Sequence, residues 1–241
     1  MRYAVFSDVH SNLEAFESVL ESLKKSNIDR YLFIGDIVGY GADPKECIAV
    51  LRRLNPSIVA GNHDRAAVGL METDYFNEAA RSAVVWTKDH ICESDRLFLN
   101  GMELIQETKD FCLVHGTLQH PEGFDYMLDE YRAQKTFSLL KQKICFVGHS
   151  HSPGVFIEEG EKIYYREPET LSLEDGKRYI VNDGSVGQPR DNDPRACFCI
   201  YDDDSGGIEF MRAAYDVALA QKKIIKAGLP RSLADRLSFG R

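Results

Sequence analysis

The sequence predicts an α/β fold in which two packed sheets are flanked by helices. Over residues 1–64, short apolar strands alternate with amphipathic helices, which is typical of βαβ units in a largely parallel sheet. After residue 151, short strands follow one another with turn residues between them. We expect the βα half and the strand-rich half to form the two sheets. The 241 residues contain neither an internal repeat nor a low-complexity linker, so we expect one domain over residues 1–241.

The N-terminal elements carry clear start signals. The apolar run Tyr3–Phe6 predicts a strand, and Ser11 with Glu14 predicts a capping box for the helix that follows. Asp43 as a cap and Pro44 at the first helical position predict the start of a second helix. Strands are predicted before and after that helix, at Tyr31–Ile34 and Ser57–Ala60.

The remaining elements are less regular. Helices are predicted at 76–91, 131–141 and about 216–227, and strands at 111–114, 144–147, 154–158, 162–166, 178–182, 196–202 and 207–212. Residues 116–130 predict an irregular loop. We expect residues 65–140 to supply loops and helices around a substrate crevice, because specificity commonly lies in such segments. Residues 216–241 are expected to form a C-terminal helical segment.

Composition excludes several classes of protein. Hydrophobic residues make up 44% and charged residues 28%, which are ordinary values for a globular chain. The net charge of −9 argues against extended nucleic acid as a partner. No apolar run approaches the roughly 20 residues of a membrane span, so no membrane partner is expected. The six cysteines form no C-x-x-C pair, which favours buried, reduced thiols and a cytoplasmic protein.

Polar side chains with oxygen or nitrogen donor atoms follow five of the predicted strands. Parallel strands place their carboxyl ends at one edge of a sheet, so these side chains can converge. They are Asp8, His10, Asp36, Asn62, His63, His115, His149 and His151. Carboxylate, amide and imidazole groups without thiolate suit divalent Mn, Fe, Co, Ni or Zn. Seven ligands from this set of eight residues are too many for one tetrahedral site. They suit two ions, provided that one carboxylate bridges them.

In order, the motifs are D-x-H at Asp8, G-D at Asp36, G-N-H-D at Asn62, a lone His115 and G-H-x-H at His149. This series resembles the calcineurin-like metallophosphoesterase superfamily, and residues 182–190 look like the glycine-serine loop of its small bacterial and archaeal phosphodiesterase-type members. The resemblance implies a four-layer α/β/β/α sandwich of two mixed sheets.

The resemblance also implies roles for individual residues. Asp8, His10 and His151 would hold one metal, while Asn62, His115 and His149 would hold the other. Asp36 would bridge the two ions, and His63 would be catalytic, either protonating the leaving oxygen or steadying the transition state. Manganese is favoured among the candidate ions. Two divalent cations outweigh the two ligating carboxylates, so the crevice would be cationic inside an acidic shell.

The function predicted on this basis is hydrolysis of a small phosphodiester or phosphomonoester by a dinuclear metal-dependent phosphoesterase, in which a metal-bridging hydroxide attacks phosphorus. One alternative is an enzyme like the protein Ser/Thr phosphatases, but the run Gly35–Gly41 lacks the second Asp and the Arg of their G-D-x-V-D-R-G motif. Another is a non-catalytic scaffold that binds metal or nucleotides, although every ligand position here is filled.

Two arginines are candidate substrate contacts. Arg65 directly follows the G-N-H-D turn and can reach a substrate phosphate, although a surface ion pair is an equal alternative. Arg190 ends the glycine-serine loop and is a weaker candidate. The sequence leaves open the substrate, the choice between monoester and diester, the metal, the oligomeric state and the group that orients His63.

Overall fold

Two six-stranded mixed sheets form the centre of the computed structural model, which describes residues 1–241. The first sheet has the order β3-β2-β1-β11-β12-β9. Its strands are β1 (Arg2–Phe6), β2 (Arg30–Ile34), β3 (Ser57–Val59), β9 (Leu171–Ser172), β11 (Ala196–Asp202) and β12 (Gly207–Ala213). The second sheet has the order β4-β5-β6-β10-β7-β8. Its strands are β4 (Ile105–Glu107), β5 (Phe111–Val114), β6 (Ile144–Val147), β7 (Gly154–Glu159), β8 (Lys162–Arg166) and β10 (Lys177–Asn182).

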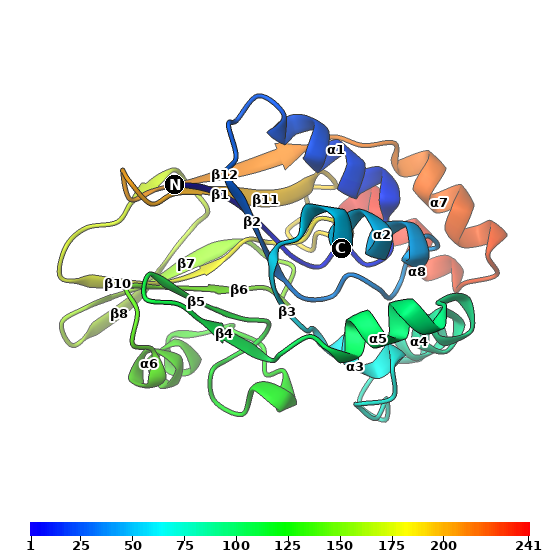
Figure 1. Cartoon of the computed structure of the whole chain (residues 1–241), viewed down its shortest axis with the longest axis horizontal. Helices are drawn as coiled ribbons and strands as arrows, with labels where there is room; N and C mark the ends of the chain where they lie inside the picture. The colour runs from blue at the N-terminus through cyan, green and yellow to red at the C-terminus, as the bar shows by residue number, and fades with distance from the viewer.

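The helices lie on the outer faces of the sheets and at one end of them (Figure 1). They are α1 (Leu13–Leu23), α2 (Pro44–Leu54), α3 (Asn62–Ala67), α4 (Glu78–His90), α5 (Glu93–Asn100), α6 (Glu130–Leu139), α7 (Val217–Lys226) and α8 (Arg231–Asp235). Single 3₁₀ turns occur at Pro121–Gly123 and Arg236–Phe239. None of the helices has the length and hydrophobicity that crossing a membrane requires.

Alternation along the strands divides the core into layers. Tyr3 and Val5 of β1 pack between the two sheets, whereas Ala4 and Phe6 pack beneath α1 and α2. In the second sheet, Leu113 faces the other sheet, while its neighbours face α6. Successive side chains of a strand point to opposite faces, so each sheet is buried on both sides. The result is the expected α/β/β/α sandwich with mixed sheets.

The division of the chain between the sheets differs from the prediction. The βα half and the strand-rich half do not form separate sheets, because β11 pairs antiparallel with β1 and joins the C-terminal strands to the N-terminal parallel ones. Likewise β10 pairs parallel with β6 and antiparallel with β7. The predicted cap of α1 also shifts by one residue. Asn12, not Ser11, accepts the N–H of Ala15, because Ser11 has a left-handed backbone with φ 55°.

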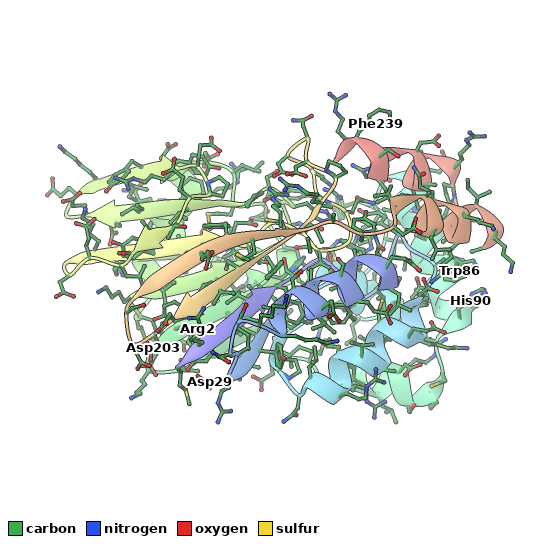
Figure 2. The ribbon with its side chains drawn as sticks, turned by 90° about the horizontal axis from the view of Figure 1, so that it is seen from above. Arg2, Asp29, Trp86, His90, Asp203 and Phe239 are labelled. Atoms are coloured by element: carbon green, nitrogen blue, oxygen red, sulfur yellow. The ribbon has the colours of Figure 1, made fainter.

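The C-terminal segment packs against the end of the sheets where β1 finishes. Seen from above, Arg2 at the start of β1 lies left of the centre, whereas Trp86 and His90 lie at the right and Phe239 lies at the upper edge (Figure 2). A separate apolar cluster joins α4, α7, α8 and the residues after β2; it contains Tyr40, Ala80, Ala83, Ala220, Ile224, Leu229, Leu233, Ala234 and Leu237. Helices α7 and α8 therefore pack beside the carboxyl ends of the strands.

Candidate metal centre

The expected ligands meet where the carboxyl ends of the two sheets come together. Asp8 and His10 follow β1, Asp36 follows β2, and Asn62 is the first residue of α3 after β3. From the second sheet, His115 follows β5, and His149 and His151 follow β6. These seven residues are all buried, and we call them the floor. Residues up to 143 positions apart in the sequence thus converge because both sheets end at the same place.

Five floor residues have a left-handed backbone conformation. Their φ angles are 52° at Asp8, 50° at His10, 60° at Asp36, 67° at His149 and 59° at His151. Asp, Asn and His occupy this region more readily than other non-glycine residues. The ligand types therefore also suit the sharp turns that follow each strand.

Each floor carboxylate has one oxygen held by the backbone and one without a partner. Asp8 Oδ2 accepts hydrogen bonds from Ser7 Oγ at 2.5 Å and from the His149 N–H at 3.0 Å. Asp36 Oδ1 accepts the His63 N–H at 2.9 Å. By contrast, Asp8 Oδ1 and Asp36 Oδ2 are buried and make no hydrogen bond. Buried carboxylate oxygens are rarely left unpaired, so these two are available to a cation.

Three imidazoles are oriented in the same way. The Nδ1 atoms of His10, His115 and His151 lie 3.0, 2.6 and 2.6 Å from the carbonyl oxygens of Val38, Ile34 and Gln188. A ring that donates from Nδ1 to a carbonyl presents the lone pair of Nε2, which is how metal-binding histidines are usually fixed. His10 Nε2 and His151 Nε2 face each other at 3.0 Å. Two facing lone pairs repel unless a cation lies beside both.

The free ligand atoms fall into neighbouring groups. A first group contains Asp8, His10 and His151, and a second contains Asp36, His115 and His149; a third, formed by His10, Asp36 and His63, overlaps both, and the ligand atoms of each group lie within 4.8 Å of one another. His115 Nε2 lies 3.3 Å from Asp36 Oδ2, and His10 Nε2 lies 3.7 Å from that same oxygen. Asn62 Oδ1 is a further buried acceptor without a partner. This donor set fits divalent cations.

The pKa values of the floor residues bear on the binding of divalent cations. Burial raises the pKa of Asp8, but the charges of His151 and His115 outweigh it and hold the pKa well below its usual range. Burial lowers the pKa of His149 to about 3 and that of His151 to about 4. For His115 the charges of Asp36 and Asp8 overcome burial and raise the pKa to about 10. Ionised carboxylates beside neutral imidazoles are the forms that bind metal, and a cation would displace the His115 proton.

His63 is oriented by packing and not by a carboxylate. Its ring centre lies 4.5 Å from that of Tyr40, 4.8 Å from His10 and 4.9 Å from Phe76, and its Nδ1 is buried without a partner. A Cβ on Gly39 would overlap that ring. Burial lowers the pKa of His63 well below its ordinary value.

The next residue, Asp64, connects the loops of the floor. Its carboxylate accepts the backbone N–H groups of Asp36, Ile37, Val38 and Gly61 at 2.7–3.3 Å. It therefore fixes the turn after β2 against the start of α3. Burial raises the pKa of Asp64 to about 7.

A cavity of about 340 Å³ opens above the floor. Asp36, Asn62, His63, His149 and His151 line it, and so does Arg190, whereas Arg65 does not. We call the other large side chains around it the rim: Tyr40, Met71, Tyr75, Phe76, Phe124, Tyr126, Leu128 and Arg132. Sequence reasoning placed the crevice loops in residues 65–140 but singled out none of these residues. Their only sequence signal is the density of aromatic residues at 75–76 and 124–131.

Known proteins share both the sequence and the fold. Residues 1–206 match the calcineurin-like phosphoesterase superfamily domain. The chain is 41% identical over 242 residues to an uncharacterized protein of Methanocaldococcus jannaschii, covering 99% of this chain and 98% of that protein. It is 36% identical to a metallophosphoesterase from Sphaerobacter thermophilus, with a TM-score of 0.89 and coverage of 100% and 99%.

A more distant structure repeats the architecture. A hypothetical protein from Pyrococcus horikoshii OT3 has a TM-score of 0.79 at 18% identity, covering 100% of this chain and 98% of that one. At that identity the likeness concerns the fold alone. The match over residues 1–206 includes every floor residue, and the Sphaerobacter structure spans the whole chain. The chain therefore belongs to the calcineurin-like phosphoesterase superfamily and is a metal-dependent phosphoric ester hydrolase.

Proposed function

We propose that this chain hydrolyses a small phosphodiester or phosphomonoester with two divalent ions at the floor. The observation that carries the proposal is the set of unpartnered ligand atoms, Asp8 Oδ1, Asp36 Oδ2, Asn62 Oδ1 and His115 Nε2, gathered beneath a cavity that is open to a small molecule. Asp8, His10 and His151 would hold one ion, Asn62, His115 and His149 would hold the other, and Asp36 would be a ligand of both. Manganese is the first ion to test.

Two ions so placed lower the pKa of water and offset the negative charge that develops on the phosphoryl oxygens. The chain itself positions the ester. The Arg190 backbone N–H donates to the His151 carbonyl at 3.0 Å, and both residues line the cavity. The Arg190 guanidinium is the group that binds a phosphoryl oxygen.

His63 also lines the cavity, where packing by Tyr40 and Phe76 fixes its ring. It donates a hydrogen bond to the ester oxygen that leaves. In the reaction a bond forms from a water oxygen to phosphorus, the bond from phosphorus to the ester oxygen breaks, and a proton from that water ends on the leaving oxygen. A ring held without a carboxylate partner suits a hydrogen-bonding role.

The test starts from metal-stripped protein. Mn, Fe, Co, Ni or Zn is added separately, and turnover of bis(4-nitrophenyl) phosphate and 4-nitrophenyl phosphate is measured, while titration calorimetry counts the bound ions. We expect turnover to depend on added metal and to reach its maximum near two ions per chain. Failure of every ion to support turnover of either ester would contradict the proposal and favour a binding scaffold. Saturation at one ion would contradict the dinuclear assignment alone.

A further inference from the structure

The rim carries aromatic side chains that hydrolysis at phosphorus does not require. Tyr75 is 94% exposed, Leu128 is 62% exposed and Tyr126 is 42% exposed, although all three border the same cavity. They come from two separate segments, one between α3 and α4 and one before α6. Large apolar side chains that gather at a cavity mouth mark a binding surface for an apolar group.

One of these rings lies flat above the floor. Tyr126 stacks on His149 with ring centres 4.0 Å apart and an angle of 12° between the planes. Tyr126 is partly exposed and lines the cavity, so the ring offers a surface on which a planar group of a ligand can stack. Offset stacking is a preferred arrangement of aromatic pairs, and the stack extends directly from a residue of the floor.

The segment before Tyr126 is held in place at a cost in backbone energy. Phe124 is 5% exposed and has φ 51°, which is a strained conformation for a bulky aromatic residue. A Cβ on Gly116 would lie 2.7 Å from the Asp125 carbonyl oxygen, so this segment packs closely against the residue after His115. Such strain persists where the surrounding structure fixes a functional geometry.

Two cationic side chains occupy different parts of the same cavity. Arg190 donates to Tyr40 Oη at 3.3 Å and to Gln188 Oε1 at 3.1 Å, and its Nε is buried without a partner. Arg132, on α6, lines the cavity and pairs with Asp129, which does not line it. Asp125 also borders the cavity, so anion binding there requires Arg132 to outweigh both carboxylates. One arginine is therefore next to His151 of the floor, and the other belongs to the rim.

Building on the proposed function, we propose that the substrate carries an aromatic ring and a second anionic group besides the phosphoryl group that is cleaved, as a nucleoside diphosphate does. In that substrate the water oxygen bonds to the terminal phosphorus, the bond from that phosphorus to the bridging oxygen breaks, and the nucleoside monophosphate leaves with the proton. The ring stacks on Tyr126, the reacting phosphoryl group lies at the floor beside Arg190, and the second anionic group pairs with Arg132. The cavity volume of about 340 Å³ is near the lower end for small-molecule sites, which suits a single nucleotide.

The experiment compares four probes on the metal-loaded protein: adenosine 5′-diphosphate, adenosine 5′-monophosphate, ribose 5-phosphate and inorganic pyrophosphate. We expect the lowest KM for the diphosphate. Removing the ring, or removing the second phosphate, raises KM about tenfold each. Calorimetry with the methylene-bridged analogue of adenosine diphosphate gives a binding constant that does not depend on turnover.

Two variants assign these effects to residues. Tyr126→Leu removes the ring and raises KM for adenosine diphosphate about tenfold, while KM for ribose 5-phosphate changes less than twofold. Arg132→Gln raises KM for the diphosphate but not for the monophosphate. Tyr164→Leu on β8 and Arg53→Gln on α2 are matched controls, because neither residue borders the cavity. Both controls are expected to match the parent protein.

The outcomes separate this inference from the proposed function. If the protein hydrolyses bis(4-nitrophenyl) phosphate but binds all four probes equally, the proposed function stands and the ring-and-anion specificity is wrong. If no ester is hydrolysed with any ion, the proposed function fails, and the binding constant of the analogue in the parent and in Tyr126→Leu still decides the role of the rim. Equal analogue binding by those two proteins overturns it.

Discussion

The floor and the rim face the same cavity but are built in different ways. Floor side chains such as Asp8 and His115 are fully buried, follow strands directly and are fixed by backbone hydrogen bonds. Rim side chains such as Tyr75 and Tyr126 are exposed and come from connecting segments. In the proposed function, the reaction type therefore depends on positions that both sheets determine together, whereas substrate choice depends on side chains that can change without disturbing either sheet.

The largest effect expected from the floor is that of Asp36→Asn. An amide cannot replace the charge of the carboxylate between the two ligand groups. Loss of a residue that only hydrogen-bonds to a metal ligand already lowers metal affinity or activity about 10–100-fold, so kcat/KM for an aryl phosphodiester should fall more than about 100-fold. Circular dichroism should show an intact fold. Asp89→Asn on the exposed face of α4 is the matched control. Near-parental turnover by Asp36→Asn in metal-defined buffer would falsify the assignment of Asp36.

Metal removal should destabilise the molecule through the floor alone. Ligand present at about 100 times its dissociation constant stabilises a folded protein by about 2.7 kcal/mol. For a chain of this size, that corresponds to roughly 5–10 °C in Tm. Calorimetric scans with and without manganese measure the shift. Arg132→Gln should retain it and Asp36→Asn should lose most of it; an equal shift in both variants would show that the ion acts elsewhere.

Gly61→Ala tests how tightly the floor is packed. A Cβ at Gly61 would overlap Asp36 Oδ1, so the carboxylate or the turn must move. Overpacking of this kind costs about 1–3 kcal/mol, and we expect a lower Tm together with weaker manganese binding. Gly101→Ala provides the comparison, because its Cβ would meet only ordinary contacts, 3.5 Å at the nearest. A variant at position 61 that matched the parent in both measurements would argue against a rigid floor.

Arg190→Gln should produce the smallest of these effects, and it should change KM rather than Tm. The side chain borders the cavity and donates to Tyr40 without supporting a strand. We expect KM for an aryl phosphomonoester to rise about tenfold, which matches the loss of one charge-assisted hydrogen bond. Tm should change by less than about 2 °C. A fall in Tm without a change in KM would show that Arg190 supports the fold rather than the substrate.

The convergence of the floor residues could be predicted from the sequence for a physical reason. Strand ends and ligand types coincide at Asp8, Asp36 and His149, so both the secondary structure and the chemistry were visible from neighbouring residues. Long-range pairing was not visible in this way. The placement of β11 against β1 depends on contacts across nearly 200 residues, and the short strands β4 and β9 have no periodicity of their own.

Rim residues escaped prediction because nothing at a fixed spacing identifies them. Tyr40 contacts His63 through the irregular segment after β2, where Asp36, Gly39 and Tyr40 have positive φ, and Tyr126 reaches His149 through the segment that contains Phe124. The same limit explains why the sequence could not show which of the two candidate arginines borders the cavity. Arg65 lies next to the ligand motif in sequence but outside the cavity lining, while Arg190, more than 120 residues from that motif, borders the cavity.

The left-handed backbone of the floor has a consequence for selection by stability. Five floor residues occupy conformations that glycine adopts with less energy, each at a cost on the order of 1 kcal/mol. Glycine at Asp36 or His151 would relieve that cost and remove a proposed ligand in one step. A screen of random variants for heat resistance in chelating buffer would therefore enrich inactive molecules, whereas the same screen with manganese present would retain active ones.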